Sequence, residues 1–288
     1  MTKTIQKHYN YLFLLPAGLV FFIFFLFPAL SSFFFSLTRW TLTDFTYIGL
    51  DNFRMFFSED SLSIGFKNTF VYAFLTMGLK VVFGLALAVY LTSAIRTKNF
   101  LRAVVFFPNL ISTIAVGITF NSLMHPSKGI INRGLAQIGI AGPDWLGNVK
   151  IALLSVIGVD AWKGVGIATV IFIAGISAIP EQYYEALSID GGNKFDRFRH
   201  ITLPLVRPAM NSVVILALIG GLRTFDLVWS MTRGGPGFTT DIISSIIYKQ
   251  YSSGFYGLST AGNVFLFVMV SVIAFPVYRF LNAREVDL

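Results

Sequence analysis

Hydrophobic residues gather in six long runs along the chain, and mostly short polar segments separate them. The runs cover approximately residues 11–37, 70–94, 103–124, 151–179, 209–230 and 261–281. About 20 helical residues cross the roughly 30 Å hydrocarbon core of a bilayer, and each run is long enough to do so. The pattern therefore predicts an all-α, polytopic membrane protein with six transmembrane helices, built as one membrane domain over residues 1–288.

The amino-acid composition agrees with a membrane protein. Hydrophobic residues make up 55% of the 288 residues and charged residues only 12%, so the charged surface of a soluble globular protein is missing. The absence of cysteine excludes disulfide and thiolate chemistry. The net charge of +8 does not indicate nucleic-acid binding, because no basic stripe interleaved with stacking aromatic residues occurs.

The distribution of Lys and Arg predicts the orientation in the membrane, because short loops rich in these residues stay on the cytoplasmic side. With the amino terminus inside, eleven basic residues lie on the inner side and eight on the outer side. The eleven are Lys3, Lys7, Arg96, Lys98, Arg102, Lys194, Arg197, Arg199, Arg207, Arg279 and Arg284. The bias predicts that both termini are cytoplasmic.

On this topology, the polar segment 180–208 lies in the cytoplasm between the fourth and fifth runs. Pro180 suits the first turn of a helix, and Gly191 supplies a left-handed residue at which that helix can stop. Asn193 can cap a second short helix, with Asp196 three residues further on. The segment is therefore predicted to form a helix-glycine-helix elbow.

The second helix of the elbow is expected to end by Leu203, because Pro204 follows it. A spacing of three places Phe195, Phe198 and Ile201 on one face of this helix. These residues leave two interpretations open. The elbow rests on the membrane surface with its arginines at lipid phosphates, or it docks into a groove of another protein, which its acidic residues and tight glycine corner favour.

The stretch EALSIDGGNKFDRFRHITLP, which starts at Glu185, resembles the EAA loop of permease subunits of binding-protein-dependent ABC importers. Glu185, Ala186, Gly191 and the Ile-x-Leu-Pro ending match that loop in spacing, and Leu187 replaces its usual second alanine. The resemblance implies that residues 181–204 form a coupling loop that sits in a cleft of a cytoplasmic ATPase. The residues it assigns to this contact are Glu185, Ala186, Asp190, Gly191, Ile201, Leu203 and Pro204.

Four further stretches resemble the carbohydrate subgroup, which includes the maltose and glycerol-phosphate permeases. They are YIGLDNF at 47–53, FFPNLIS at 106–112, GIINRGL at 129–135 and TRGGPGFTT at 232–240. The resemblance implies a type I importer permease that moves a sugar or oligosaccharide across the plasma membrane. The partners it implies are a second homologous permease, two copies of a cytoplasmic ATPase and an extracytoplasmic sugar-binding protein, with lipid bilayer around the helices and no nucleic acid.

Motifs for intrinsic catalysis are missing from the sequence. No phosphate loop of the form G-x-x-x-x-G-K-[ST] occurs, so ATP and Mg²⁺ are expected on the partner ATPase and no cofactor on this chain. The three histidines, His8, His125 and His200, lack the spacing of metal ligands. We therefore expect a non-catalytic subunit with neither a catalytic residue nor a metal site.

Arg279 lies near the end of the last run, and five other ionisable residues fall further inside the predicted spans, where a charged side chain costs at least roughly 2.5–3.5 kcal/mol at the helix centre. They are Lys80, Asp160, Lys163, Arg223 and Asp226. A spacing of three lets Asp160 pair with Lys163, and Arg223 with Asp226, on one helix face. Lys80 either pairs with one of these carboxylates or meets an anionic group of a substrate.

A functional interpretation of the same segments places them around a polar cavity, which the resembling permeases build chiefly from their fourth and fifth spans. Sugars are held by hydrogen-bonding groups and aromatic faces, both of which these segments contain. The candidate cavity residues are Asp160, Trp162, Lys163, Gly164, Gly221, Arg223 and Thr224.

An ion-coupled secondary transporter is the alternative function, with Lys80 and Asp160 as its coupled pair. Many such transporters have broken helices in corresponding halves, and the sequence shows no such pair. A membrane scaffold protein is a third, blander interpretation.

Overall fold

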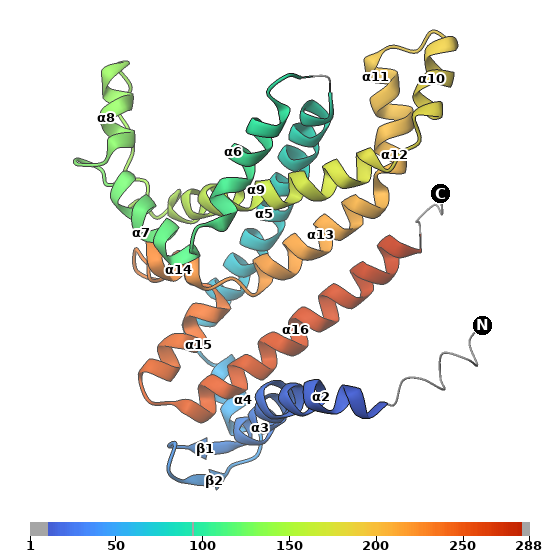
Figure 1. Ribbon diagram of the computed structural model, residues 1–288. Helices are drawn as coiled ribbons and strands as arrows, with labels where there is room; N and C mark the ends of the chain where they lie inside the picture. The colour runs from blue at the N-terminus through green and yellow to red at the C-terminus, as the bar shows by residue number, and fades with distance from the viewer. Residues whose placement is uncertain (1–10, 94, 284–288) are drawn as a thin grey trace. The chain divides into compact units, whose positions relative to one another are not determined.

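The computed structural model describes residues 11–93 and 95–283, and its regular structure is almost entirely helical (Figure 1). Four residues used above, Lys3, Lys7, His8 and Arg284, lie outside the described residues. The chain forms two compact units, residues 1–59 with 247–267 and residues 60–246 with 268–288. The expectation of a single membrane domain stays a prediction.

The first unit contains a long apolar helix and a β-hairpin. A 3-10 turn (Tyr11–Leu14) leads into α2 (Leu15–Phe21), a π-helical segment (Phe22–Leu26) and α3 (Phe27–Ser36). Strands β1 (Thr38–Trp40) and β2 (Phe45–Tyr47) pair antiparallel, with Thr38 opposite Tyr47, and α4 (Asp51–Phe57) follows. The buried Asn52 donates hydrogen bonds of 2.8 and 2.7 Å to the carbonyls of Ser36 and Thr38, so one side chain joins α4 to the helix end and the hairpin.

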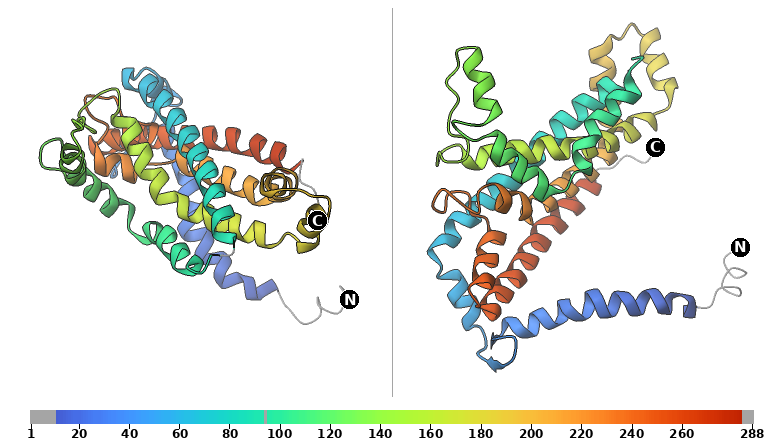
Figure 2. Two further views of the ribbon diagram at one scale, coloured as in Figure 1. Left: turned by 90° about the horizontal axis from the view of Figure 1, so that it is seen from above. Right: turned by 60° about the vertical axis from the view of Figure 1, so that its left-hand side comes forward.

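The second unit is helical throughout its regular structure. Its elements are α5 (Asp60–Thr92), α6 (Lys98–Leu110), α7 (Thr113–Leu123), α8 (Ile130–Gln137), α9 (Ala152–Ser177), α10 (Glu181–Ile189), α11 (Lys194–Asp196), a π-helical segment (Arg197–Thr202), α12 (Leu203–Leu205), α13 (Arg207–Leu222) and α14 (Asp226–Met231). Helices α15 (Ile243–Ser252) and α16 (Tyr256–Asn282) have residues in both units. Helix α5 packs against α9 and α13, and α6 packs against α9 (Figures 1 and 2).

Among the residues that the structure describes, four helices are long and apolar enough to cross a membrane, and the number of spans rises to six if each of two bent helix pairs counts as one. The four are Leu15–Ser36, Asp60–Thr92, Ala152–Ser177 and Tyr256–Asn282. This confirms the helical membrane fold that the hydrophobic runs predict. Helix α5 begins about ten residues earlier than the second run, because its first turns carry Asp60 and Lys67 and therefore fall outside a purely hydrophobic window.

Two of the six expected spans are not continuous helices. Helices α6 and α7 meet at 95°, where Ile111 and Ser112 are extended and Pro108 lies inside the end of α6. The fifth run, expected over 209–230, contains α13 only as far as Leu222, and the helical segment before α13 meets it at 66°. Hydrophobicity alone does not reveal such breaks, because the broken segments are as apolar as continuous ones.

The core of the second unit consists of two apolar clusters that follow α5 and α9. One contains Tyr72 and Val159, and the other contains Leu85 and Ala168. Lys80 and Asp160 fall between these clusters along the two helices. A polar layer therefore interrupts the hydrophobic interior at the level of these two residues.

We expect Gly166→Ala to destabilise the protein, whereas Gly158→Ala on the same helix has no such effect. A Cβ at Gly166 would collide with the Val105 carbonyl and lie 3.0 Å from the Phe106 Cα, whereas a Cβ at Gly158 meets nothing within 4 Å. Overpacking typically costs about 1–3 kcal/mol. Thermal unfolding of both variants in detergent measures the difference, and equal midpoints would contradict the close approach of α6 to α9.

Candidate functional site: the elbow and an intramembrane cavity

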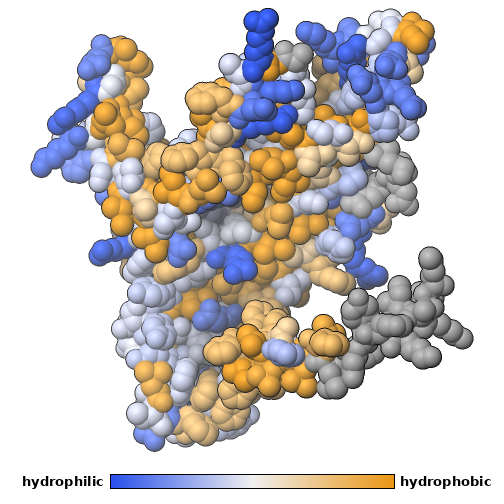
Figure 3. Space-filling view, in the orientation of Figure 1, coloured by the Kyte–Doolittle hydropathy of each residue, from blue (hydrophilic) through white to orange (hydrophobic). Residues whose placement is uncertain are grey.

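The elbow consists of α10 and α11, which project beyond the ends of α5 and α9 (Figures 1 and 2). Hydrophilic side chains gather over it in the space-filling view (Figure 3). Gly191 has a φ of +80°, which confirms the predicted left-handed corner, since non-glycine residues rarely adopt this conformation. The Gly192 N–H donates to the Leu187 carbonyl at 2.8 Å, so the corner closes α10 tightly.

The second arm of the elbow starts with the predicted capping box. The Asn193 side chain accepts hydrogen bonds from the N–H groups of Phe195 and Asp196 at 2.8 and 3.1 Å. The Asp196 carboxylate accepts one in return from the Asn193 N–H at 2.9 Å. These reciprocal bonds satisfy backbone donors that a helix start leaves open, so they fix the direction of the second arm.

Two side-chain contacts brace the arms against each other. Arg197 Nη2 donates to the Ser188 hydroxyl at 2.6 Å, and the hydroxyls of Tyr184 and Thr202 lie 3.0 Å apart. Both contacts join α10 to the π-helical segment after α11. The elbow is therefore braced internally and does not depend on a partner for its shape.

The second arm differs from its prediction in two ways. Phe195 is 62% exposed near the tip while Ile201 is 8% exposed at the root, and residues 197–202 are wound as a π-helix, in which a spacing of three does not return to the same side. The helix also continues past Leu203, since Pro204 lies in the first turn of α12, where its missing N–H has no helical partner to lose.

The coupling residues expected from the resemblance separate into a tip and a root. Glu185, Ala186, Asp190 and Gly191 are exposed on α10 and at the corner, whereas Ile201 is buried and Leu203 and Pro204 are half-buried where the second arm meets α13. The exposed group is available to a partner. The buried group connects the elbow to the membrane helices.

Sequence reasoning missed the most exposed apolar side chain of the elbow. Ile189 is 87% exposed and directly precedes Asp190 at the corner. Single exposed apolar residues are common on protein surfaces, and Ile189 is a candidate contact residue because it lies at the tip of the braced elbow. An isoleucine between a serine and an aspartate in a polar segment is the signal that could have found it.

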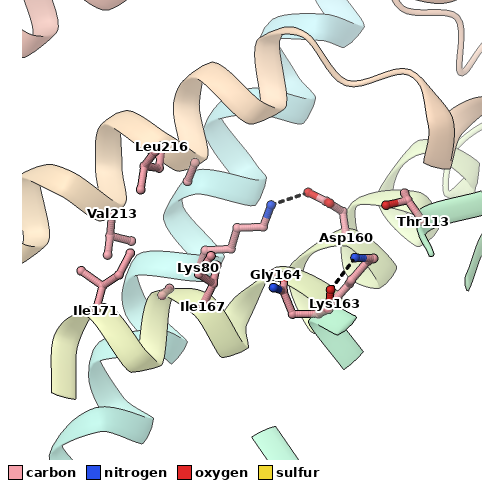
Figure 4. Close-up of a pocket in the computed structure, with 12 residues that line it drawn as sticks. Lys80, Thr113, Asp160, Lys163, Gly164, Ile167, Ile171, Val213 and Leu216 are labelled. Carbon is pink, nitrogen blue, oxygen red and sulfur yellow. Dashed lines mark hydrogen bonds and ion pairs between the residues drawn. The ribbon is translucent and has the colours of Figure 1, made fainter. Parts of the chain in front are cut away.

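Inside the second unit, Lys80 of α5 and Asp160 of α9 form an ion pair of 2.7 Å (Figure 4). Their side chains are only 13% and 19% exposed. This decides the alternatives left open for Lys80 in favour of a carboxylate partner. It also shows that the expected pairing of Asp160 with Lys163 is wrong, since Asp160 binds a residue 80 positions earlier in the chain.

A cavity of about 270 Å³ lies beside this ion pair. Its polar lining comes from Lys80, Asp160, Lys163, Asn109 and Thr113, and apolar residues of α9 and α13 complete it (Figure 4). Lys163 Nζ donates to the Asn109 carbonyl at a long 3.4 Å. The break between α6 and α7 brings Asn109 and Thr113 to the cavity, and neither was identified from the sequence.

Glycine makes room for the ion pair. A Cβ at Gly164 would collide with the Lys80 side chain, so a larger residue there would push the lysine away from Asp160. Of the seven predicted cavity residues, the structure thus brings Asp160, Lys163 and Gly164 together. Their role toward a substrate stays a prediction.

The other four predicted residues lie elsewhere in the second unit. Trp162 contacts the ring of Phe120 with centroids 5.1 Å apart and lines a separate apolar groove, and Gly221 packs closely on Ala73. Arg223 and Thr224 lie in the break between α13 and α14. The predicted pairing of Arg223 with Asp226 on one helix face is therefore wrong, because the helix ends at Leu222.

The stretches that resemble carbohydrate permeases hold side chains that fasten loops. Asn132 of GIINRGL donates to the carbonyls of Pro126 and Pro143 at 2.9 and 3.0 Å. Thr240 of TRGGPGFTT donates to the Gly235 carbonyl at 2.7 Å, and Asn68 of α5 donates to the Thr239 carbonyl at 2.8 Å. Their local role is thus to shape the loops, as Asn52 of YIGLDNF does.

Within residues 11–93 and 95–283, no three His, Asp or Glu side chains gather as a possible metal site. Membrane helices with a projecting polar elbow and a charged cavity between them are consistent with a transport permease. Residues 80–286 match the family of binding-protein-dependent transport system inner membrane components. The chain belongs to this family and is the transmembrane subunit of an ATP-driven importer, as the EAA-like stretch indicates.

Named sugar permeases match this protein in sequence over nearly the whole chain. The chain is 32% identical to the trehalose/maltose transport system permease protein MalF of Thermococcus litoralis, and the match covers 94% of each. It is 30% identical to the multiple sugar-binding transport system permease protein MsmF of Streptococcus mutans, over 94% of each. The alternative of an ion-coupled secondary transporter therefore has no support, although the Lys80–Asp160 pair that this alternative invoked is present in the structure.

The fold also matches a solved structure. One chain of a bacterial ABC transporter that imports the acidic polysaccharide alginate superposes with a TM-score of 0.84 and 24% sequence identity, covering 95% of this chain and 94% of that one. At this identity the likeness supports the fold only. It confirms the architecture of an ABC importer permease for the described helices.

Proposed function

We propose that this protein is one of two homologous transmembrane subunits of an ATP-driven importer for a sugar or oligosaccharide. The assembly would contain two copies of a cytoplasmic ATPase, which binds ATP and Mg²⁺, and an extracytoplasmic sugar-binding protein. Relatives named as sugar permeases at 30–32% identity over most of the chain support the cargo class. The basic residues on the inner side support cytoplasmic termini in the plasma membrane.

The observation that carries the proposal is the braced elbow. Its tip exposes a carboxylate, Glu185, and an apolar side chain, Ile189. Its root buries Ile201 at the start of the segment that leads into α13. A force applied to the tip therefore reaches a membrane helix through packed residues.

In the proposed cycle, ATP draws the two ATPase copies together and the elbows follow them. The membrane helices then open outward, the binding protein releases the sugar into the cavity, and ATP hydrolysis returns the inward-facing state. The Lys80–Asp160 pair and Lys163 line the part of the path that this subunit contributes.

We expect Glu185→Ala to lower ATP-driven sugar uptake by at least about tenfold in proteoliposomes that contain the whole importer. Truncating one partner of a buried interfacial charge pair costs roughly 2–5 kcal/mol, and Glu185 would lose its basic partner on the ATPase. The matched control is Asp60→Ala, which removes an exposed carboxylate at the opposite, outer end of α5. Undiminished uptake with Glu185→Ala in a stable assembly would refute the coupling role.

A further inference from the structure

The charges that line the intramembrane cavity do not cancel. Lys80 and Asp160 neutralise each other at 2.7 Å, and Lys163 is the remaining charged side chain of the lining. Among the residues that the structure describes, Lys163 has no carboxylate within ion-pair distance. The cavity wall of this subunit therefore carries a net charge of +1.

The hydrogen bond that Lys163 makes within the described part of the chain does not neutralise it. Its Nζ donates to the Asn109 carbonyl at 3.4 Å, which is long compared with the 2.7–3.2 Å typical of N–H···O bonds. A carbonyl is also a dipole and not a counter-ion. At least two of the three ammonium donors are left for another acceptor.

Lys163 cannot escape to the membrane surface. It lies 11 residues from the start and 14 residues from the end of α9, which is about 16 and 21 Å along the axis at 1.5 Å per residue. Lysines near helix ends extend their amino groups to the interface, but this one is close to the middle. An ionisable residue at such a position is expected to serve transport or to have a counter-charge.

The other charges inside the predicted spans do not change this result. Arg223 and Asp226 carry opposite charges and lie outside the cavity lining. Apart from Arg279, which lies near the end of the last run, the spans thus contain three basic and two acidic side chains. An anion that enters the cavity would bring the sum to zero.

We propose that the cargo is an anionic saccharide and that Lys163 binds its charged group, either a carboxylate of a uronic acid or a phosphate ester. The proposal rests on the sugar-importer function above and narrows its substrate class. The Lys80–Asp160 pair then has a distinct task, because it holds Lys80 back and leaves one cation for the cargo. Gly164 permits this by leaving room for the Lys80 side chain.

In the test, the reconstituted importer receives ATP on the ATPase side. A mixture of neutral, uronic-acid and phosphorylated saccharides is then offered as cargo. Mass spectrometry then identifies the species that accumulate. Accumulation of uronic saccharides or of sugar phosphates supports the proposal and names the anionic group. Accumulation of neutral saccharides alone overturns it but leaves the sugar importer intact, whereas no ATP-dependent accumulation overturns both.

Substitutions of Lys163 test whether this residue binds the anionic group of the cargo. Lys163→Met is expected to lower the ratio of anionic to neutral uptake by about tenfold, because a charge-assisted hydrogen bond is lost, and Lys163→Arg is expected to keep most of the ratio. Lys67→Met, which removes an exposed lysine near the outer end of α5, is the matched control. The ratio does not depend on how much of each variant assembles, and an unchanged ratio in Lys163→Met would assign the counter-charge to a neighbouring subunit and refute the proposal.

Discussion

Replacement of Ile189 by aspartate is expected to abolish ATP-driven uptake, with a loss of at least about a hundredfold. The side chain is 87% exposed at the tip of a braced elbow. Burying a large aliphatic side chain contributes about 1.5–3 kcal/mol, and the variant would also place an unpaired carboxylate in the contact, which is costly. Together these effects exceed the roughly 2.8 kcal/mol that corresponds to a hundredfold change in affinity.

The measurement is co-purification of the ATPase with the permease, followed by uptake in proteoliposomes. Ile138→Asp is the matched control, because Ile138 is 70% exposed and lies beyond α8 in a segment expected on the outer side. It should leave the amount of bound ATPase unchanged. If Ile189→Asp retains the ATPase as fully as this control does, the tip of the elbow is not the contact surface.

Removing the carboxylate of Asp160 is expected to be the most destabilising single change in the membrane interior. Asp160→Ala leaves the Lys80 ammonium without its partner at 2.7 Å, at a site where both side chains are less than one-fifth exposed. Breaking a buried pair by removing one member typically costs about 3–5 kcal/mol. We expect a loss of about 3 kcal/mol in the free energy of unfolding, the lower end of this range, because both side chains line a cavity and are partly exposed.

The double variant Lys80→Met/Asp160→Leu removes both charges and keeps apolar side chains of similar volume, so it distinguishes the effect of charge from that of packing. Replacing a buried ion pair by apolar residues of similar volume is often nearly neutral, so the double variant should recover most of the stability. Thermal unfolding of the detergent-solubilised chain compares wild type with the single and double variants. A double variant as unstable as Asp160→Ala would show that packing, and not an uncompensated charge, causes the loss.

The local features of the elbow were accessible from the sequence. The turn at Gly191 and the capping box of Asn193 with Asp196 depend on residues at most a few positions apart, so general rules of turn and cap chemistry suffice. The exposure of Phe195 and the burial of Ile201 were not accessible in this way. They depend on which part of the second arm other helices cover, and the spacing of the sequence does not encode this.

The charged residues of the membrane interior show the same limit more strongly. The position of five ionisable residues inside the spans was accessible from the sequence, and three of them, Lys80, Asp160 and Lys163, line a cavity in the structure. Their pairing was not, because Lys80 and Asp160 come from helices 80 residues apart in the chain and the spacing of three made Lys163 look like the natural partner. The neighbours Asn109 and Thr113 reach the cavity only because α6 and α7 bend by 95°.

The sequence by itself determined that this protein is a helical membrane permease and where its elbow lies, since hydrophobic run length, turn residues and a 20-residue motif are properties of contiguous chain. Only the tertiary structure decided which charges neutralise each other, which spans are broken, and which side chains of the elbow remain in water. Those outcomes depend on distances between segments far apart in the chain. No local pattern carries such distances, because packing between helices sets them after each helix has formed.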